Sequence, residues 1–365
     1  MFELLFIIGL IAFIGFGGRW AFERTRVPEV LILLAVGFAL GPLGLLSQFT
    51  LLDIDLNSFR IVAPFIGAVA IVSLVFEAGL RLKLEQVSKR ISFSTAFALS
   101  NFVACVSVLT VILHFGFGWN LLSSLLLGAI LGGPSSLAVY SMLPFVRTSN
   151  QARSVLYLEA TLSTLLACAL AISVMRYANT DMAGAGLFSA LKMFFSSFSI
   201  SLILGLAIGV AVLWALFRFK IKKFGYLLTL SALFMLYFID FELLGGIGVI
   251  SIAVIGLVIG NSGSVFKLLG VSGKFDLDET SKGFQEEISL FVSTFFFVYL
   301  GMVARPDYFT SLNNVAIAVA LVAGILVARS VILWLAKKLG RSQQNENLLL
   351  QVMIPRNLLS ATLAT

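Results

Sequence analysis

The sequence predicts an all-α polytopic membrane protein. Of its 365 residues, 59% are hydrophobic and only 12% are charged, whereas soluble domains carry about 25% charged residues. Apolar runs of about 20 residues recur along the chain, and each is long enough for a helix to cross the roughly 30 Å hydrocarbon core of a bilayer. The alternating segments of about 10 residues that a membrane β-barrel needs are not visible. The lipid bilayer is therefore the expected environment of the chain.

Hydropathy and helix-breaking residues predict about twelve spans. The first run, MFELLFIIGLIAFIGFGGRW, lacks the basic start of a cleavable signal peptide, so we interpret it as a span. The seventh is long enough to be tilted or to extend past the lipid. In chain order the predicted spans are 3–18, 27–47, 59–82, 91–115, 120–145, 154–178, 187–217, 223–239, 243–260, 284–304, 313–336 and 346–365.

The distribution of positive charge predicts which side of the membrane each loop faces. The net charge is +7, but the basic residues lie in short loops and not on one soluble module, so nucleic-acid binding is not expected. Loops on one side hold only Arg60, Arg176, Lys192 and Arg305, while every other basic loop residue lies on the opposite side. The positive-inside rule makes the richer side cytoplasmic and places the N-terminus outside. A multi-pass protein of the plasma membrane is expected.

The sequence contains no motif for an enzyme, a cofactor or a metal site. P-loop, GxSxG, HExxH and CxxC patterns are absent. Cys105 and Cys168 each lie within an apolar run and are predicted to be buried free thiols. Asp240 and Glu242 lie at the outer end of a span, where we expect both carboxylates to be solvated.

Four charged residues are predicted to lie deep within spans: Glu77, Glu159, Arg329 and Arg356. A charge near the bilayer centre costs at least about 2.5–3.5 kcal/mol on insertion scales, so such groups normally face other helices and find partners there. Two acids and two bases can pair. The simplest interpretation for at least one pair is a structural ion pair that holds two helices together.

Two predicted spans contain helix breaks. Gly132, Gly133 and Pro134 interrupt the span at 120–145, and two hydroxyl side chains, Ser135 and Ser136, follow directly. Non-helical backbone at membrane depth persists only where it is buried in protein or lines a cavity. The serine hydroxyls can bond the freed backbone groups or an ion. A simple proline kink capped by serines is the alternative.

The second break is Pro355, followed by Arg356 and Asn357, in the last predicted span. One interrupted helix in each half of a chain is typical of inverted-repeat transporters, in which the substrate site lies where the breaks meet. The sequence ends at LLSATLAT, within this apolar run. We expect a further span or domain to follow it.

Six segments together resemble the sodium/proton exchanger branch of the monovalent cation:proton antiporter superfamily. They occur in the family's order over nearly the whole chain, and Glu77 lies at the position of an acidic residue of the family's third span. The segments are RVPEVLILLAVGFALGP, LVFEAGLRLKL, LYLEATLST, VSTFFFVYLGM, LVARSVIL and MIPRNLLSATLA.

The resemblance implies a fold of about thirteen spans, usually in a homodimer. In this fold a core part, here near 91–178 and 313–365, moves against a dimerisation part formed by the rest of residues 1–365. Two broken helices cross in the core, which places the breaks at Gly132, Gly133 and Pro134 and at Pro355. The resemblance also implies that the thirteenth span would follow the end of this sequence.

Residue by residue, the resemblance implies that Glu159 and Arg329 form the family's structural ion pair and that Arg356 is the basic residue beside the second break. Two departures concern the ion site. The family's Thr-Asp-Pro of the fifth span is replaced here by Gly132, Gly133 and Pro134, and its Asn-Asp of the sixth span by Ser163 and Thr164.

These departures leave three hypotheses for function. A threonine hydroxyl can offer an oxygen to a cation but cannot carry the charge that offsets cation dehydration. The first hypothesis is a monovalent cation:proton antiporter in which Glu159 or Glu77 carries the proton. The second is a transporter of an anionic or polar solute held by Arg356. The third is a membrane scaffold or sensor that transports nothing. In the first two, the expected site residues are Ser135, Ser136, Glu159, Ser163, Thr164 and Arg356.

Overall fold

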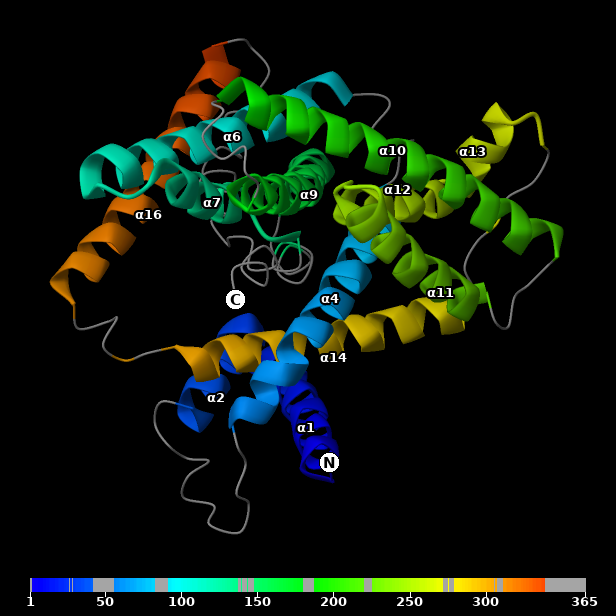
Figure 1. Ribbon diagram of the computed structural model, residues 1–365, viewed down its shortest axis with the longest axis horizontal. Helices are drawn as coiled ribbons and strands as arrows, with labels where there is room; N and C mark the ends of the chain where they lie inside the picture. Colours follow the sequence, from blue (N-terminus) through cyan, green and yellow to red (C-terminus); the bar gives the residue numbers. More distant parts are fainter. Residues whose placement is uncertain are drawn as a thin grey trace. The chain divides into compact units, whose positions relative to one another are not determined.

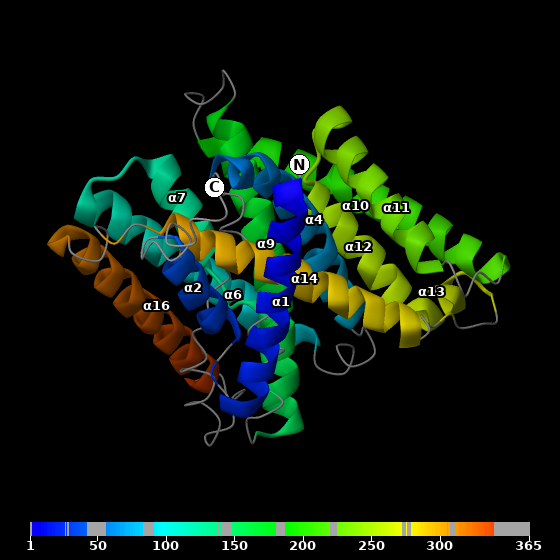
Figure 2. The same ribbon diagram turned by 90° about the horizontal axis from the view of Figure 1, so that it is seen from below.

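The computed structural model describes residues 2–25, 27, 29–41, 56–82, 91–136, 139, 143, 148–179, 187–219, 225–271, 275, 279–304, 306 and 311–338. Within these ranges the chain forms α-helices and two π-helical turns (Figures 1 and 2). Helices occupy eleven of the twelve predicted ranges, and the twelfth, 346–365, lies outside the described residues.

The helices follow the apolar runs closely because each run satisfies its backbone polar groups internally, as a lipid environment demands. Six helices of the described part are long and apolar enough to cross a membrane, and a seventh candidate is the pair α12 and α13, which bends by 85°. The bounds are α1 Phe2–Thr25, α2 Glu29–Leu40, α4 Leu56–Arg81, α6 Ile91–Val111, η1 Ile112–Gly116, α7 Leu121–Leu131, α9 Asn150–Ala178, α10 Leu187–Arg218, α11 Gly225–Phe238, η3 Ile239–Leu243, α12 Gly248–Gly260, α13 Ser262–Leu268, α14 Glu279–Val303 and α16 Leu312–Lys338.

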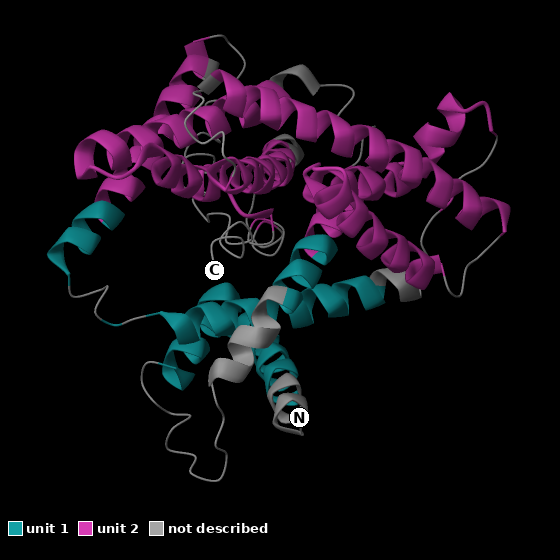
Figure 3. Ribbon diagram, viewed as in Figure 1, with its two compact units in different colours: residues 1–73, 283–318, 365 teal, residues 74–282, 319–364 magenta. Residues whose placement is uncertain are grey.

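The chain divides into two compact units (Figure 3). Unit 1 comprises residues 1–73 and 283–318, and therefore holds α1, α2, most of α4 and α14. Its core contains Ile11, Ile66, Ala70 and Phe295. Helices α2 and α14 touch backbone to backbone, since a Cβ on Gly301 would strike the main chain of α2. Small residues at such crossings are how helices in lipid pack closely.

Unit 2 comprises residues 74–282 and 319–364. In its described part, α6, α7 and α9 pack against one another, and α10 packs along α12. Helix α16 joins the first group through Leu333, which lies in one apolar cluster with Phe97 of α6 and Val155 of α9. The unit thus includes the predicted core range 91–178 and also the range 187–282, which the resemblance assigned to the dimerisation part.

Candidate functional site

Helix α9 carries three of the predicted site residues in its middle two turns. It begins after Ser149, whose hydroxyl accepts a hydrogen bond from the Ala152 N–H (3.2 Å) and so caps the helix. Glu159, Ser163 and Thr164 all lie on this helix with 0%, 0% and 2% of their surface exposed. Because side chains four residues apart share a helix face, Glu159 and Ser163 follow one another along the same side of α9.

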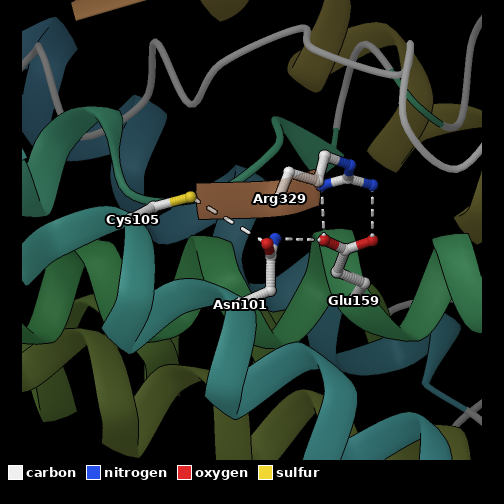
Figure 4. A network of polar contacts seen from close by, with 4 residues as sticks. All are labelled: Asn101, Cys105, Glu159 and Arg329. Atoms are coloured by element: carbon white, nitrogen blue, oxygen red, sulfur yellow. Dashed lines mark hydrogen bonds and ion pairs between the residues drawn. The ribbon is translucent and has the colours of Figure 1, made fainter. Parts of the chain in front are cut away.

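Glu159 is fully engaged in a buried network (Figure 4). Its carboxylate receives two parallel hydrogen bonds from the Arg329 guanidinium of α16, Nη1 to Oε1 at 2.7 Å and Nη2 to Oε2 at 3.0 Å. Asn101 of α6 donates a third, from Nδ2 to Oε1 at 2.7 Å. Both charged side chains are 0% exposed. Such a bidentate pair neutralises both charges and gives both groups hydrogen-bond partners. Together with Asn101 it links α6, α9 and α16.

Asn101 was missed by the sequence analysis, which considered only charged residues within spans. It also accepts a weak hydrogen bond from the Cys105 thiol (3.9 Å) one turn further along α6 (Figure 4). A lone amide within the apolar run AFALSNFVACVSVL needs a partner in lipid. That requirement was the available indication that Asn101 belongs to the network.

The chain ceases to be helical directly after α7. The helix ends at Leu131, residues 132–135 are not helical, and the Val139 N–H again bonds the Ser135 carbonyl (3.0 Å). Gly133 lies against α9 so closely that a Cβ there would overlap the side chain of Ser163. At Gly132 a Cβ would come within 2.6 Å of Val106. The two glycines therefore allow this non-helical segment to sit on α6 and α9.

The structure brings the segment that contains Ser135 and Ser136 into contact with α9. The Ser136 N–H donates a hydrogen bond to Thr164 Oγ1 (3.2 Å), and Ser135 is 6% exposed. The Ser163 hydroxyl is buried and has no hydrogen-bond partner among the described residues. An unpaired buried hydroxyl costs about 1–3 kcal/mol. The contact region therefore offers an oxygen that is free to accept a further donor or to bind a cation.

The other two predicted charges are Arg356 and Glu77. Pro355 and Arg356 lie outside the described residues. Glu77 lies near the end of α4 and pairs with Arg81 one turn later (2.5 Å), where the two side chains are 15% and 41% exposed. Within the described part of the chain, no group of three or more His, Cys, Asp or Glu side chains is placed to hold a metal ion.

The prediction that Asp240 is solvated is wrong. Its side chain is 0% exposed, whereas Glu242 is exposed as predicted. The chain enters the π-helical turn η3 after α11, and this turn directs Asp240 toward α10 and Gly246. Position at the end of an apolar run cannot distinguish a side chain that faces water from one that faces a neighbouring helix.

Comparison with known proteins establishes the family. The family described as "Sodium/hydrogen exchanger, transmembrane" matches residues 9–365. The chain belongs to this sodium/hydrogen exchanger family. Its members are membrane transporters and not enzymes, in agreement with the sequence analysis. The multi-pass membrane architecture expected from hydropathy is likewise that of the sodium/hydrogen exchanger family.

Individual relatives are distant. The chain is 23% identical to "Sodium/hydrogen exchanger 7" of Arabidopsis thaliana over 313 residues, which cover 82% of the chain and 26% of that protein. It is 29% identical to "K(+)/H(+) antiporter NhaP2" of Shewanella sp. (strain ANA-3) over 247 residues, which cover 66% of the chain and 40% of that protein. The chain thus spans less than half the length of these relatives.

The fold matches a solved antiporter structure. The sodium proton antiporter MjNhaP1 from Methanocaldococcus jannaschii, solved at pH 8, superposes with a TM-score of 0.81 and 18% identity. The match covers 99% of this chain and 86% of that one. The chain therefore has the fold of this antiporter, as the resemblance of its motifs predicted.

Proposed function

We propose that the chain exchanges a monovalent cation for protons by alternating access. The proposal rests on one observation above all, the buried and unpaired Ser163 hydroxyl at the contact between α9 and the non-helical segment after α7. Two relatives are named for sodium/hydrogen exchange and K(+)/H(+) antiport, which supports the class of substrate. The proposal includes the homodimer that the family resemblance implies, a location in the plasma membrane, and the outside N-terminus predicted by the positive-inside rule.

The proposed cation site contains Ser135, Ser136, Ser163 and Thr164. Hydroxyl and main-chain oxygens can replace part of a cation's hydration shell, and interrupted helices in transporters expose such oxygens. Thr164 Oγ1 accepts the Ser136 N–H, which holds this oxygen at the contact between α9 and the segment after α7. In this proposal a second break at Pro355 crosses the first, as in the thirteen-span fold, and residues 91–178 and 313–365 form the moving core.

The proton carrier of this proposal is Glu77. Of the two candidate acids, Glu159 has both oxygens bound by Arg329 and a third hydrogen bond from Asn101. Taking a proton would break that buried pair, which costs more than the pair contributes. Glu77 pairs with Arg81 of its own helix and its side chain is 15% exposed, so a proton can reach it. Glu159 then serves as the structural partner of Arg329.

Proteoliposomes that contain a pH-sensitive dye test this proposal. Addition of NaCl or KCl outside should change the internal pH, and Glu77→Gln should abolish the change. Thr164→Val removes the site hydroxyl and should lower the exchange rate at least tenfold. Thr229→Val is a matched control, because the buried Thr229 hydroxyl bonds only its own helix at the Gly225 carbonyl (2.8 Å). Absence of a cation-driven pH change over a broad pH range would overturn the proposal.

The Glu159–Arg329 network also favours a second candidate function. Since this pair is neutral and position 164 carries a hydroxyl in place of a carboxylate, a site that included Arg356 would carry a positive charge. Such a site would hold an anionic or polar solute. Flux driven by an anion gradient and lost in Arg356→Ala would identify this function. A chain without flux for any tested ion, purified together with a partner protein, would instead be the scaffold or sensor.

A further inference from the structure

Asp240 carries a buried carboxylate. It lies in the π-helical turn η3, between α11 and α12, and 0% of its surface is exposed. Neither Oδ1 nor Oδ2 has a hydrogen-bond partner among the described residues. Glu159 is the only other described acidic residue that is fully buried, and it receives three hydrogen bonds. An ionised carboxylate removed from water needs such compensation, and none of the described side chains provides it to Asp240.

A second oxygen faces the same point as the Asp240 carboxylate. A Cβ built on Gly246 would overlap Asp240 Oδ1 and come within 2.6 Å of Ser201 Oγ. The carboxylate and the hydroxyl therefore converge beside Gly246, which is itself buried and has no side chain to separate them. Only a residue without a Cβ permits this arrangement.

The hydroxyl of Ser201 is held in place by two hydrogen bonds. It donates to the Ser197 carbonyl (3.0 Å) one turn earlier in α10 and accepts the Ile247 N–H (2.6 Å) at the start of α12. One lone pair of Ser201 Oγ remains available. The Ser197 hydroxyl, in turn, donates to the Gly245 carbonyl (2.7 Å), which fixes the turn next to Gly246. The oxygens around Asp240 are thus preorganised by α10 and the α11–α12 connection.

Among the described residues, the charges around this point sum to one negative charge. Asp240 and Glu242 are two carboxylates of η3, and Arg176 at the end of α9 is a cation that interacts electrostatically with both. Arg176 does not reach either carboxylate at ion-pair distance in the described part of the chain. Its guanidinium instead donates to the Phe241 carbonyl and lies 4.0 Å from the centre of the Phe241 ring. The carbonyl end of a helix favours cations, and a second positive charge is needed there.

We propose that Asp240 and Ser201 bind an alkali-metal cation. One uncompensated charge matches a monovalent ion. Interrupted helices of transporters coordinate such ions with carboxylates, hydroxyls and helix-end carbonyls. This site is separate from the one proposed between α7 and α9, and its existence does not depend on transport.

Equilibrium binding to the detergent-purified protein tests the proposal directly. The probes are ²²Na⁺ and ⁸⁶Rb⁺, with N-methyl-D-glucamine chloride holding the ionic strength constant. Asp240→Asn should bind one ion fewer per chain than the unsubstituted protein, and Ser201→Ala should weaken binding at this site about tenfold. Glu286→Gln, which removes one exposed carboxylate of α14, should bind as many ions as the unsubstituted protein.

The outcomes separate this site from the proposed transport site. Thr164→Val should leave the Asp240-dependent ion bound, whether or not the protein exchanges cations for protons. Equal binding by Asp240→Asn and the unsubstituted protein would overturn the proposal. Release of a proton in a pH titration, without any tracer bound at Asp240, would also overturn it. If Asp240→Asn does not elute as a folded protein, Ser201→Ala is the deciding variant. Binding about ten times weaker supports the site, and unchanged binding overturns it.

Discussion

At the scale of single residues, the Glu159–Arg329 pair should carry the largest stability effect. Arg329→Met leaves the buried Glu159 carboxylate with Asn101 as its only described partner, and stranding one member of a buried pair costs about 3–5 kcal/mol. We therefore expect a large drop in the free energy of unfolding. Thermal unfolding of the detergent-purified protein measures it.

Two variants control this prediction. Glu77→Gln removes a partly exposed pair between residues four apart, so it should cost about 1 kcal/mol or less. Glu159→Leu combined with Arg329→Met replaces both charges by apolar groups and should be more stable than Arg329→Met alone. A double variant no more stable than the single one would show that the loss does not come from a stranded charge.

The sequence predicted which charged residues lie within spans, but it predicted only part of what surrounds them. Both members of the Glu159–Arg329 pair are single charges within apolar runs, and lipid forces such residues to find partners. Asn101 was missed because an uncharged amide was not treated in the same way. Asp240 was misjudged because burial at a span end depends on the neighbouring α10, which the local sequence does not encode.

At the scale of elements, hydropathy located the described helices, some ends closely and others several residues away, but it did not show the packing between them. For example, α10 covers Leu187–Arg218 where the sequence predicted 187–217. The stop after α7 could also be anticipated from two glycines and a proline. The sequence alone could not show that Gly133 rests on Ser163, because that contact joins residues 30 positions apart in different elements.

The contact between Gly133 and Ser163 gives a prediction at this scale. Gly133→Ala should reduce the free energy of unfolding by about 1–3 kcal/mol, because the added methyl group overlaps Ser163 and must displace either the segment after α7 or α9. Thermal unfolding measures the loss. Gly67→Ala is the control, since a Cβ there meets nothing within 4 Å and Ala favours the helix. Equal stability of the two variants would contradict the close packing.

At the scale of the whole molecule, the two compact units cut through helices and do not follow the chain in simple order. Residues 1–73 join 283–318 across more than half of the sequence, through contacts such as Gln285 Nε2 to the Ser73 carbonyl (3.0 Å). Hydropathy carries no information on which helices become neighbours. The resemblance to the antiporter family supplied that level of the prediction, as a core part and a dimerisation part.

Membrane sidedness is the last prediction at this scale. Lys192 near the start of α10 and Lys267 in α13 are both exposed, and the three helices α10, α11 and α12 lie between them. Three crossings put two points on opposite sides of a membrane.

The positive-inside rule assigns Lys267 to the cytoplasm and Lys192 to the outside. A chain with Cys105→Ala and Cys168→Ala offers a background for labelling, because both native thiols are buried and not in a disulfide, and alanine keeps each position small and apolar. In this background an impermeant maleimide should label Lys192→Cys in intact cells, and Lys267→Cys only in inverted vesicles. Labelling with the sides exchanged would reverse the orientation, and labelling of both positions from one side would contradict three crossings.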